Sequence, residues 1–242
     1  MKDQKVLGVI GGLGPIATAY FMELIIRMTD AKTDQEHLDM VIYNTPSIPD
    51  RTSYILGNSR KNPLPGMIDV ARTLDKQKVS QIAIPCMTAH YFYSQLQQSI
   101  QTPIVNCLAE TANILKESAL SKVGIMATDG SISAELFQKE LRNVGITPVI
   151  PSQEGQSKVM HLIYSDIKAN LPPEMDMFRS VSRELREQGA QAIILGCTEL
   201  SLIKRDCSIG AGYLDAMEVL VQQSIVRCGG KLKKEYENLI SR

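Results

Sequence analysis

The stretch Ile84-Pro85-Cys86-Met87-Thr88-Ala89-His90 places a cysteine directly after an apolar run, and Leu195-Gly196-Cys197-Thr198-Glu199-Leu200 does the same in the second half of the chain. Cys197 follows Cys86 by 111 residues. A cysteine between a buried strand and a helix start lies where free helix amides and the helix dipole favour thiolate over thiol. The pair therefore predicts two thiols that face one cleft.

Short aliphatic runs alternate along the whole chain with longer amphipathic stretches, which is typical of repeated βαβ units. Continuous apolar strands joined by helices indicate an α/β fold whose parallel sheets are covered on both faces. The predicted strands are residues 6–10, 40–43, 81–85, 104–106, 123–127, 147–150 and 192–195, and the predicted helices are residues 16–28, 65–76, 89–99, 108–118, 134–143, 159–169, 175–188 and 213–227.

The order of these elements repeats. Residues 6–10 end in a glycine-rich turn, and residues 123–127 end in Thr128-Asp129-Gly130 at an offset of 117 residues. We expect two similar open parallel-sheet lobes related by a pseudo-twofold, with the active site in the cleft between them. Residues 1–117 form the first predicted lobe and residues 118–212 the second, and residues 213–242 form a C-terminal helix that packs back on the first.

The amino-acid composition limits the kinds of binding partner that we expect for this protein. The 242 residues are 44% hydrophobic and 21% charged, with 26 Lys+Arg against 26 Asp+Glu, so no charge excess favours nucleic acid or an anionic membrane. A small-molecule partner is the better expectation. The five cysteines contain no C-x-x-C pair, which disfavours a metal site, and their odd number without an N-terminal leader predicts free thiols in the cytoplasm.

A glycine-rich turn after the first predicted strand raises a competing hypothesis. Gly12-Leu13-Gly14-Pro15-Ile16-Ala17 fits the dinucleotide pattern G-x-G-x-x-A. The acidic residue expected after the second strand is missing, because Asn44-Thr45-Pro46 stands there, and Pro15 lacks an amide. A tight strand-to-helix turn with Pro15 at the first helical position is the favoured interpretation.

Several motifs together resemble the aspartate/glutamate racemase family, a family of cofactor-independent amino-acid racemases. They are Ile10-Gly11-Gly12-Leu13-Gly14-Pro15-Ile16-Ala17-Thr18, Ser47-Ile48-Pro49-Asp50-Arg51-Thr52, and the two cysteine stretches quoted above. Their order matches that family through nearly the whole chain. The resemblance implies racemisation of aspartate or glutamate by two cysteines on opposite faces of the substrate, without pyridoxal phosphate or metal, in a possible homodimer.

The chemistry of racemisation agrees with this implication. Inverting an α-carbon needs a base on one face and an acid on the other, and a thiolate with a thiol supplies both. The carbanion formed between the two steps needs cations or donors near the substrate carboxylate. Arg51 suits that task because its fork can grip a carboxylate through two hydrogen bonds, although a surface ion pair with Asp50 is the plain alternative.

The remaining candidates combine spacing with the resemblance. Tyr164 and Lys168 are four residues apart and share a helix face. The family resemblance implies that Lys168 holds a substrate carboxylate and that Tyr164 and Asp50 support a cysteine. Glu199 either orients Cys197 or caps the next helix. The other predicted substrate-binding residues are Gly12, Met87, Thr88, Thr128 and Thr198, and capping is the alternative for each threonine.

Met87 departs from the family, which usually has asparagine at this position. An amide able to bind a carboxylate is replaced by a flexible apolar thioether. Three alternatives therefore stay open beside an acidic-amino-acid racemase: a broad-specificity or non-acidic racemase, a cysteine-dependent dicarboxylate isomerase, and a weakened homologue that only binds amino acids.

Overall fold

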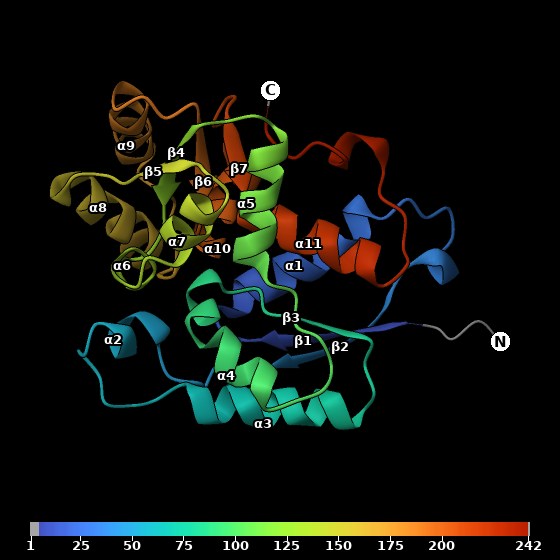
Figure 1. Ribbon diagram of the computed structural model, residues 1–242. Helices are drawn as coiled ribbons and strands as arrows, with labels where there is room; N and C mark the ends of the chain where they lie inside the picture. Colours follow the sequence, from blue (N-terminus) through green and yellow to red (C-terminus); the bar gives the residue numbers. More distant parts are fainter. Residues whose placement is uncertain (1–4, 242) are drawn as a thin grey trace.

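The computed structural model describes residues 5–241, which form two parallel sheets with helices on both faces. The first sheet has the strand order β2-β1-β3 and the second has the order β5-β4-β6-β7 (Figure 1). The strands are β1 (Val6–Gly11), β2 (Asp39–Asn44), β3 (Gln81–Ala83), β4 (Lys122–Met126), β5 (Thr147–Val149), β6 (Ala192–Leu195) and β7 (Tyr213–Asp215).

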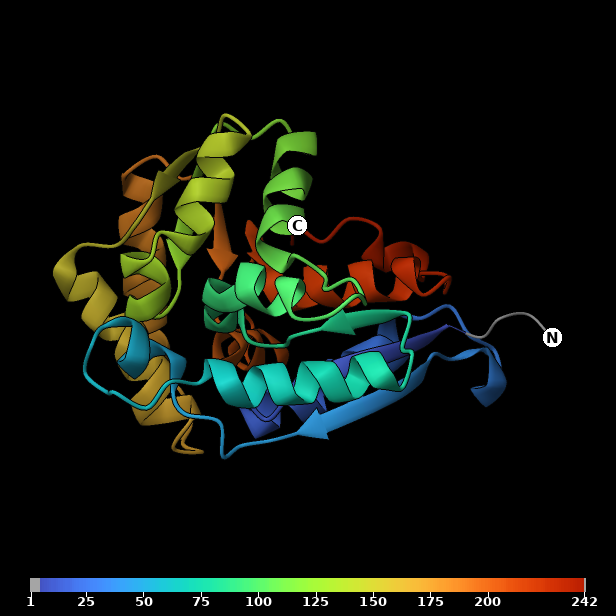
Figure 2. The same cartoon turned by 60° about the horizontal axis from the view of Figure 1, so that its bottom comes forward.

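The α-helices cover both faces of each sheet. They are α1 (Pro15–Met28), α2 (Arg51–Ile55), α3 (Leu64–Lys76), α4 (Tyr93–Gln98), α5 (Cys107–Glu117), α6 (Asp129–Ser133), α7 (Leu136–Asn143), α8 (Gln153–Met160), α9 (Met175–Glu187), α10 (Thr198–Asp206) and α11 (Ala216–Arg227). In the first lobe α3 lies on one side of the sheet and α1 and α11 lie on the other (Figures 1 and 2). In the second lobe α8 and α9 lie opposite α7 and α5, and α5 comes from residues predicted to belong to the first lobe.

Burial on both faces explains why the strand sequences are continuously apolar. In β1, Leu7 and Val9 belong to one hydrophobic cluster and Ile10 belongs to another, and all three side chains have 0% exposure. Residues that alternate along a strand point to opposite faces. A strand with helices on both faces therefore shows no alternation of polar and apolar residues.

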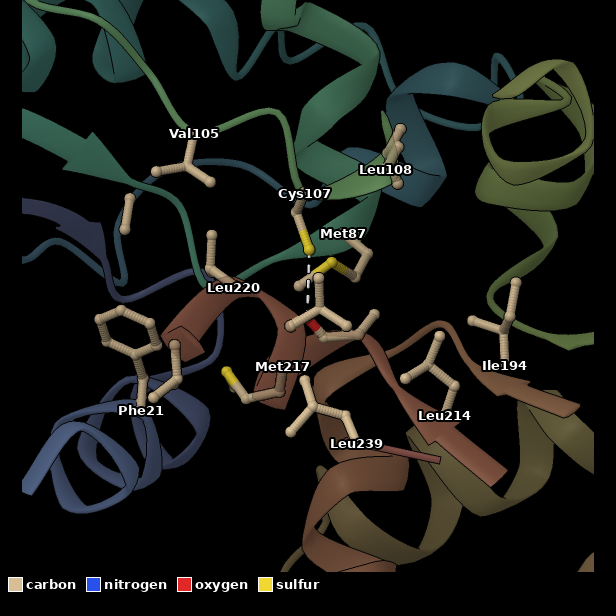
Figure 3. Close-up of a cluster of buried hydrophobic side chains, with 14 of the residues drawn as sticks. Phe21, Met87, Val105, Cys107, Leu108, Ile194, Leu214, Met217, Leu220 and Leu239 are labelled. Atoms are coloured by element: carbon tan, nitrogen blue, oxygen red, sulfur yellow. Dashed lines mark hydrogen bonds between the residues drawn. The ribbon is translucent and has the colours of Figure 1, made fainter. Parts of the chain in front are cut away.

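One hydrophobic cluster joins the two lobes around α11. Phe21 of α1, Met87 and Leu220 of α11 lie in the same cluster as Ile194 of the second sheet (Figure 3). The Cys107 thiol donates a hydrogen bond of 3.1 Å to the main-chain carbonyl of Ala216. The lobes thus share a packed interior beside the cleft between them.

The C-terminal segment differs from its prediction. The sequence predicted a helix from residue 213, but Tyr213–Asp215 forms strand β7, which pairs with β6 in the second sheet. The helix begins at Ala216 because the Asp215 side chain accepts a hydrogen bond from the Met217 amide at 2.8 Å. From there α11 contacts α1, α5 and β3.

Three other predicted elements also differ in detail. Residues 104–106 contribute only a single bridge to β3, between Ile82 and Ile104, and form no full strand. The predicted helix 89–99 is a 3-10 segment, Met87–Phe92, followed by α4. The predicted helix 159–169 divides into the end of α8 and a π-helix, His161–Ile167. Among the described residues, no helix has the length and apolar character needed to cross a membrane.

Candidate active site

A pocket lies between the two lobes at the carboxyl ends of their strands. Its first-lobe residues are Leu13, Asp50, Arg51, Thr52, Cys86, Met87 and Thr88, and its second-lobe residues are Thr128, Tyr164, Lys168, Cys197, Thr198 and Glu199. The free space is about 10 Å³, which is room for about one water molecule. An amino acid can therefore enter only after the lining residues or the lobes move apart.

Eleven of the twelve predicted site residues line this pocket, and Gly12 does not. The Gly12 amide donates a hydrogen bond of 2.9 Å to Thr18 Oγ1, so it is already used within the turn. Its φ of +85° requires glycine, and a side chain there would meet the backbone of Thr45. The neighbouring Leu13 lines the pocket instead. Gly12 thus shapes the turn that presents Leu13.

Cys86 enters the pocket from the end of the first sheet. It follows β3 and caps the 3-10 segment Met87–Phe92, and 7% of its surface is exposed. His90 fixes this turn, because its Nδ1 lies 3.1 Å from the Cys86 carbonyl and its Nε2 accepts from the Cys107 amide at 3.4 Å. Burial lowers the pKa of His90, so the ring is neutral and donates from Nδ1.

Arg51 lies beside Cys86 and is itself buried. Its Nη2 donates to the Leu13 carbonyl at 2.6 Å and its Nη1 donates to the Pro49 carbonyl at 2.9 Å. Burial alone would lower the pKa of Arg51, but the neighbouring Cys86 and Asp50 raise it above its usual value. The predicted two-bond grip on a substrate carboxylate therefore competes with main-chain carbonyls that the same fork already holds.

Cys197 has the opposite electrostatic surroundings. It caps α10 after β6, and its thiol donates to Glu199 Oε2 at 2.9 Å. Burial, followed by the charge of Glu199, raises the pKa of Cys197 well above its usual value, and Lys168 opposes this shift. Cys197 is thus held as a neutral thiol next to a carboxylate.

Asp50 and Tyr164 connect the lobes across the pocket. Asp50 Oδ1 caps α2 by accepting from the Ser53 amide at 2.7 Å, and Oδ2 accepts from the Tyr164 hydroxyl at 3.2 Å. Burial raises the pKa of Asp50, but the Ser53 hydrogen bond and the charges of Lys168 and Arg51 outweigh it, so the carboxyl is ionised. Burial raises the pKa of Tyr164 to about 12.

Lys168 lies between the two acidic groups of the pocket. Its Nζ is 3.9 Å from Asp50 Oδ2, 4.0 Å from Glu199 Oε1 and 4.2 Å from the centre of the Tyr164 ring. Burial lowers the pKa of Lys168, but Glu199 is the main group that raises it above its usual value. The residue ends the π-helix, a distortion that often occurs at functional sites.

Hydroxyl groups complete the pocket wall. Thr88 Oγ1 lies 2.9 Å from Thr128 Oγ1 and 3.0 Å from Ser131 Oγ, and so forms a second link between the lobes. Thr198 Oγ1 donates to Glu199 Oε2 at 3.2 Å. Met87, 1% exposed, brings an apolar thioether to the pocket and packs into the shared interior behind it.

The sequence interpretation missed Leu13, Thr52 and Ser131. Leu13 and Thr52 stand inside motifs that it quoted, directly beside Gly12 and Arg51, so adjacency was the available signal. Ser131 directly follows the quoted turn Thr128-Asp129-Gly130, but only the fold shows that its hydroxyl meets Thr88. Within residues 5–241, no group of three or more His, Cys, Asp or Glu side chains is arranged to hold a metal ion.

Comparisons with known proteins agree with this architecture. A family model described as Asp/Glu/Hydantoin racemase matches residues 10–224. The broad specificity amino-acid racemase RacX of Bacillus subtilis (strain 168) is 28% identical over 225 residues, which are 90% of this chain and 96% of that protein.

Solved structures show the same fold over nearly the whole chain. Picrophilus torridus aspartate racemase has a TM-score of 0.81 and 30% identity, and the match covers 97% of this chain and 99% of that chain. Glutamate racemase from Francisella tularensis subsp. tularensis SCHU S4 in complex with D-glutamate has a TM-score of 0.63 at 17% identity, covering 91% and 80%, and is alike in fold alone. The predicted α/β class and the family resemblance are confirmed: the chain belongs to the Asp/Glu/hydantoin racemase family, whose racemases are isomerases.

Proposed function

We propose that this protein racemises an α-amino acid by proton transfer between Cys86 and Cys197. The single observation that supports this most strongly is that both cysteines line one pocket, each from the turn after a strand in its own lobe. Racemisation needs one proton-transfer group on each side of the α-carbon, and this arrangement offers two thiols.

The surroundings of the two thiols suggest a starting state. Arg51 stands beside Cys86, and its raised pKa keeps a cation on that side of the pocket. Cys197 begins as the thiol that donates to Glu199. In one direction the Cys86 thiolate removes the α-proton, and the Cys197 thiol returns a proton to the other face. Cys86 then holds one proton more and Cys197 one fewer, and the reverse reaction or exchange with solvent restores the start.

Charge stabilisation would come from the cations of the pocket. Removing the α-proton spreads negative charge onto the substrate carboxylate, and preorganised donors lower the cost of that charge. Lys168 and the remaining donors of Arg51 are the available cations, and Thr88, Thr128 and Thr198 add hydroxyl donors. Asp50 and Glu199 supply the negative charge that an α-ammonium group requires.

The substrate is proposed from two sources. The resemblance carried by the sequence motifs implies aspartate or glutamate, and the similar Picrophilus torridus protein is an aspartate racemase. The similar Bacillus subtilis protein is a broad specificity amino-acid racemase, so non-acidic amino acids belong in the same proposal as the alternative.

Exchange of the α-proton in deuterated buffer tests the mechanism and the substrate together. Each common amino acid is incubated with the protein without added cofactor; loss of the α-proton NMR signal reports exchange, and loss of optical rotation reports racemisation. We expect racemisation by the intact protein and a loss of about 10³-fold in Cys86→Ser and in Cys197→Ser. Cys207→Ser, outside the pocket, is the matched control. Racemisation retained in both pocket variants would refute the two-cysteine mechanism.

A binding protein without turnover is the second candidate, because Met87 offers no hydrogen-bond donor to a substrate carboxylate. Calorimetric titration with the same amino acids separates the two functions. Saturable binding without α-proton exchange would favour the binding protein, and restored exchange in Met87→Asn would identify the missing amide as the cause.

A further inference from the structure

A second hollow lies in the second lobe, away from the pocket between the lobes. We call it the α9 groove, and it lies between α9 and residues 207–213, with a volume of about 600 Å³. Its floor contains Tyr213, the first residue of β7, whereas the cysteine pocket lies at the carboxyl ends of the strands. Figure 1 shows α9 on the side of the second sheet away from the first sheet. The groove is therefore separate from the candidate active site.

Three arginines of α9 line this groove. Arg179, Arg183 and Arg186 are four and three residues apart, a spacing that places them on one face of a helix. Arg186 is held in place, because its Nη2 donates to the Ala211 carbonyl at 2.7 Å and its guanidinium lies 5.3 Å from the centre of the Tyr213 ring. The helix thus presents a row of cationic forks with one member fixed.

The opposite wall of the groove is a glycine-rich loop. Gly210 and Gly212 have φ values of +80° and +82°, which turn the chain tightly between Cys207 and β7. Within the described part of the chain, the amides of residues 208–211 donate no hydrogen bond to protein atoms, whereas the Gly212 amide donates to the Ser241 carbonyl. Free amides in a tight turn are suited to hold an anion.

The charge balance of the groove also favours an anion. Glu187 is the acidic residue that lines it, and Arg179 pairs with Asp176 at 3.1 Å, where both side chains are largely exposed. Such an exposed pair contributes little and leaves the arginine available. Arg183 forms no ion pair with any residue between 5 and 241, in a chain whose total charge is balanced. The excess positive charge is therefore local to this groove.

We propose that the α9 groove binds a phosphate-bearing small molecule. Arginine forks donate paired hydrogen bonds to phosphate oxygens, and the opposite wall contains Ile209 and Ala211, whose amides have no acceptor among the described residues. The groove is wide open, so its volume of about 600 Å³ includes space at the surface and a ligand there would stay partly in solvent. The half-buried side chain of Ile209 provides an apolar surface for the organic part of such a ligand. This proposal does not depend on the racemase mechanism.

Calorimetric titration with inorganic pyrophosphate and with a nucleoside diphosphate tests the site. We expect saturable binding by the intact protein with a Kd of about 1 mM or lower at low ionic strength, weakened about tenfold or more in Arg183→Glu. Arg72→Glu is the matched control, since it reverses an exposed arginine on α3, and it should change the Kd less than about twofold. Arg183→Gln repeats the test should charge reversal disturb folding, which thermal unfolding reports.

Comparing the two ligands shows whether the α9 groove recognises phosphate groups alone or also the organic part of the molecule. Equal affinity for both would mean that the groove recognises phosphate groups alone, and tighter binding of the nucleoside diphosphate would mean that the organic part contributes. Either result supports the site when Arg183→Glu weakens it. The proposal is overturned if no saturable binding occurs up to about 10 mM. It is also overturned if Arg183→Glu and Arg72→Glu weaken binding equally, because attraction to the total charge of the protein alone predicts that result.

Discussion

Replacing Asp215 with asparagine should make the protein less sensitive to alkaline pH. Asp215 has 0% exposure, and its Oδ1 accepts from Ser201 Oγ at 2.6 Å and from the Met217 amide at 2.8 Å. Its Oδ2 is buried and has no partner in the described part of the chain. Burial, and then the charge of Glu218, raises the pKa of Asp215 to about 7, although Lys204 opposes this shift.

The size of the effect follows from linkage between proton binding and folding. The Asp215 carboxyl has a pKa of 3.8 in its reference state and about 7 in the folded protein. Between these two pH values the folded protein therefore holds a proton that the unfolded protein has released. Its contribution to stability is fully present below 3.8 and is lost as pH rises through about 7. From about pH 5.5 to about pH 8, the loss is about 2 kcal/mol.

Urea unfolding followed by circular dichroism at about pH 5.5, 6.5 and 8 measures this loss. Asp215→Asn keeps an oxygen that accepts from Ser201 and Met217 but cannot ionise. Any fixed cost of the amide cancels when the pH values are compared, so the variant should gain about 2 kcal/mol on the intact protein between the lowest and highest pH. Asp69→Asn, at an exposed carboxyl on α3, is the control. Parallel stability curves for Asp215→Asn and the intact protein would refute the reasoning.

Three further substitutions test the site and the turn beside it. Glu199→Gln removes the charge that helps raise the pKa of Cys197, so alkylation of that thiol should begin at lower pH, and an unchanged alkylation profile would contradict this. If Glu199 exchanges a proton with Cys197, racemisation should also fall about 10²-fold or more. Tyr164→Phe removes the hydroxyl that donates to Asp50 across the lobes and should destabilise the protein by about 1 kcal/mol in urea unfolding, whereas an unchanged midpoint would show that the link contributes nothing. Gly12→Ala forces a side chain against the backbone of Thr45 at a φ of +85° and should cost about 2 kcal/mol or more by calorimetry; a neutral result would mean that the turn relaxes freely.

The fold class could be predicted because burial leaves a direct trace in the sequence. Strands such as β1 and β6 are covered on both faces, so their residues are apolar without interruption. Short elements leave a weaker trace. Tyr213–Asp215 was assigned to a helix because the residues after it are helical, and only its pairing with β6 shows that it is a strand. That pairing is a tertiary contact, which local pattern does not contain.

The candidate site could be predicted where a sequence motif contains both the functional residue and the strand end that positions it. Cys86 and Cys197 stand at strand ends, and that position alone brings them to the pocket. The sequence could not show which hydrogen-bond donors of Arg51 remain free for a substrate. The carbonyls of Leu13 and Pro49, which accept from Arg51, lie beside it only in the folded protein. Hydrogen-bond competition of this kind depends on three-dimensional geometry rather than on spacing.

The two cysteines occupy matching places in the fold, yet their neighbours carry opposite charges. Under the proposed mechanism, Arg51 beside Cys86 and Glu199 beside Cys197 favour a resting state in which Cys197 is the thiol. A symmetric pair would leave the enzyme divided between both resting states, each able to act on only one enantiomer. The asymmetry predicts instead that kcat and KM each differ between the two enantiomers, while kcat/KM stays equal for both because the equilibrium constant between enantiomers is unity. Lys168 limits the bias, since it lies within 4.0 Å of Glu199 and reduces the negative charge that Cys197 experiences.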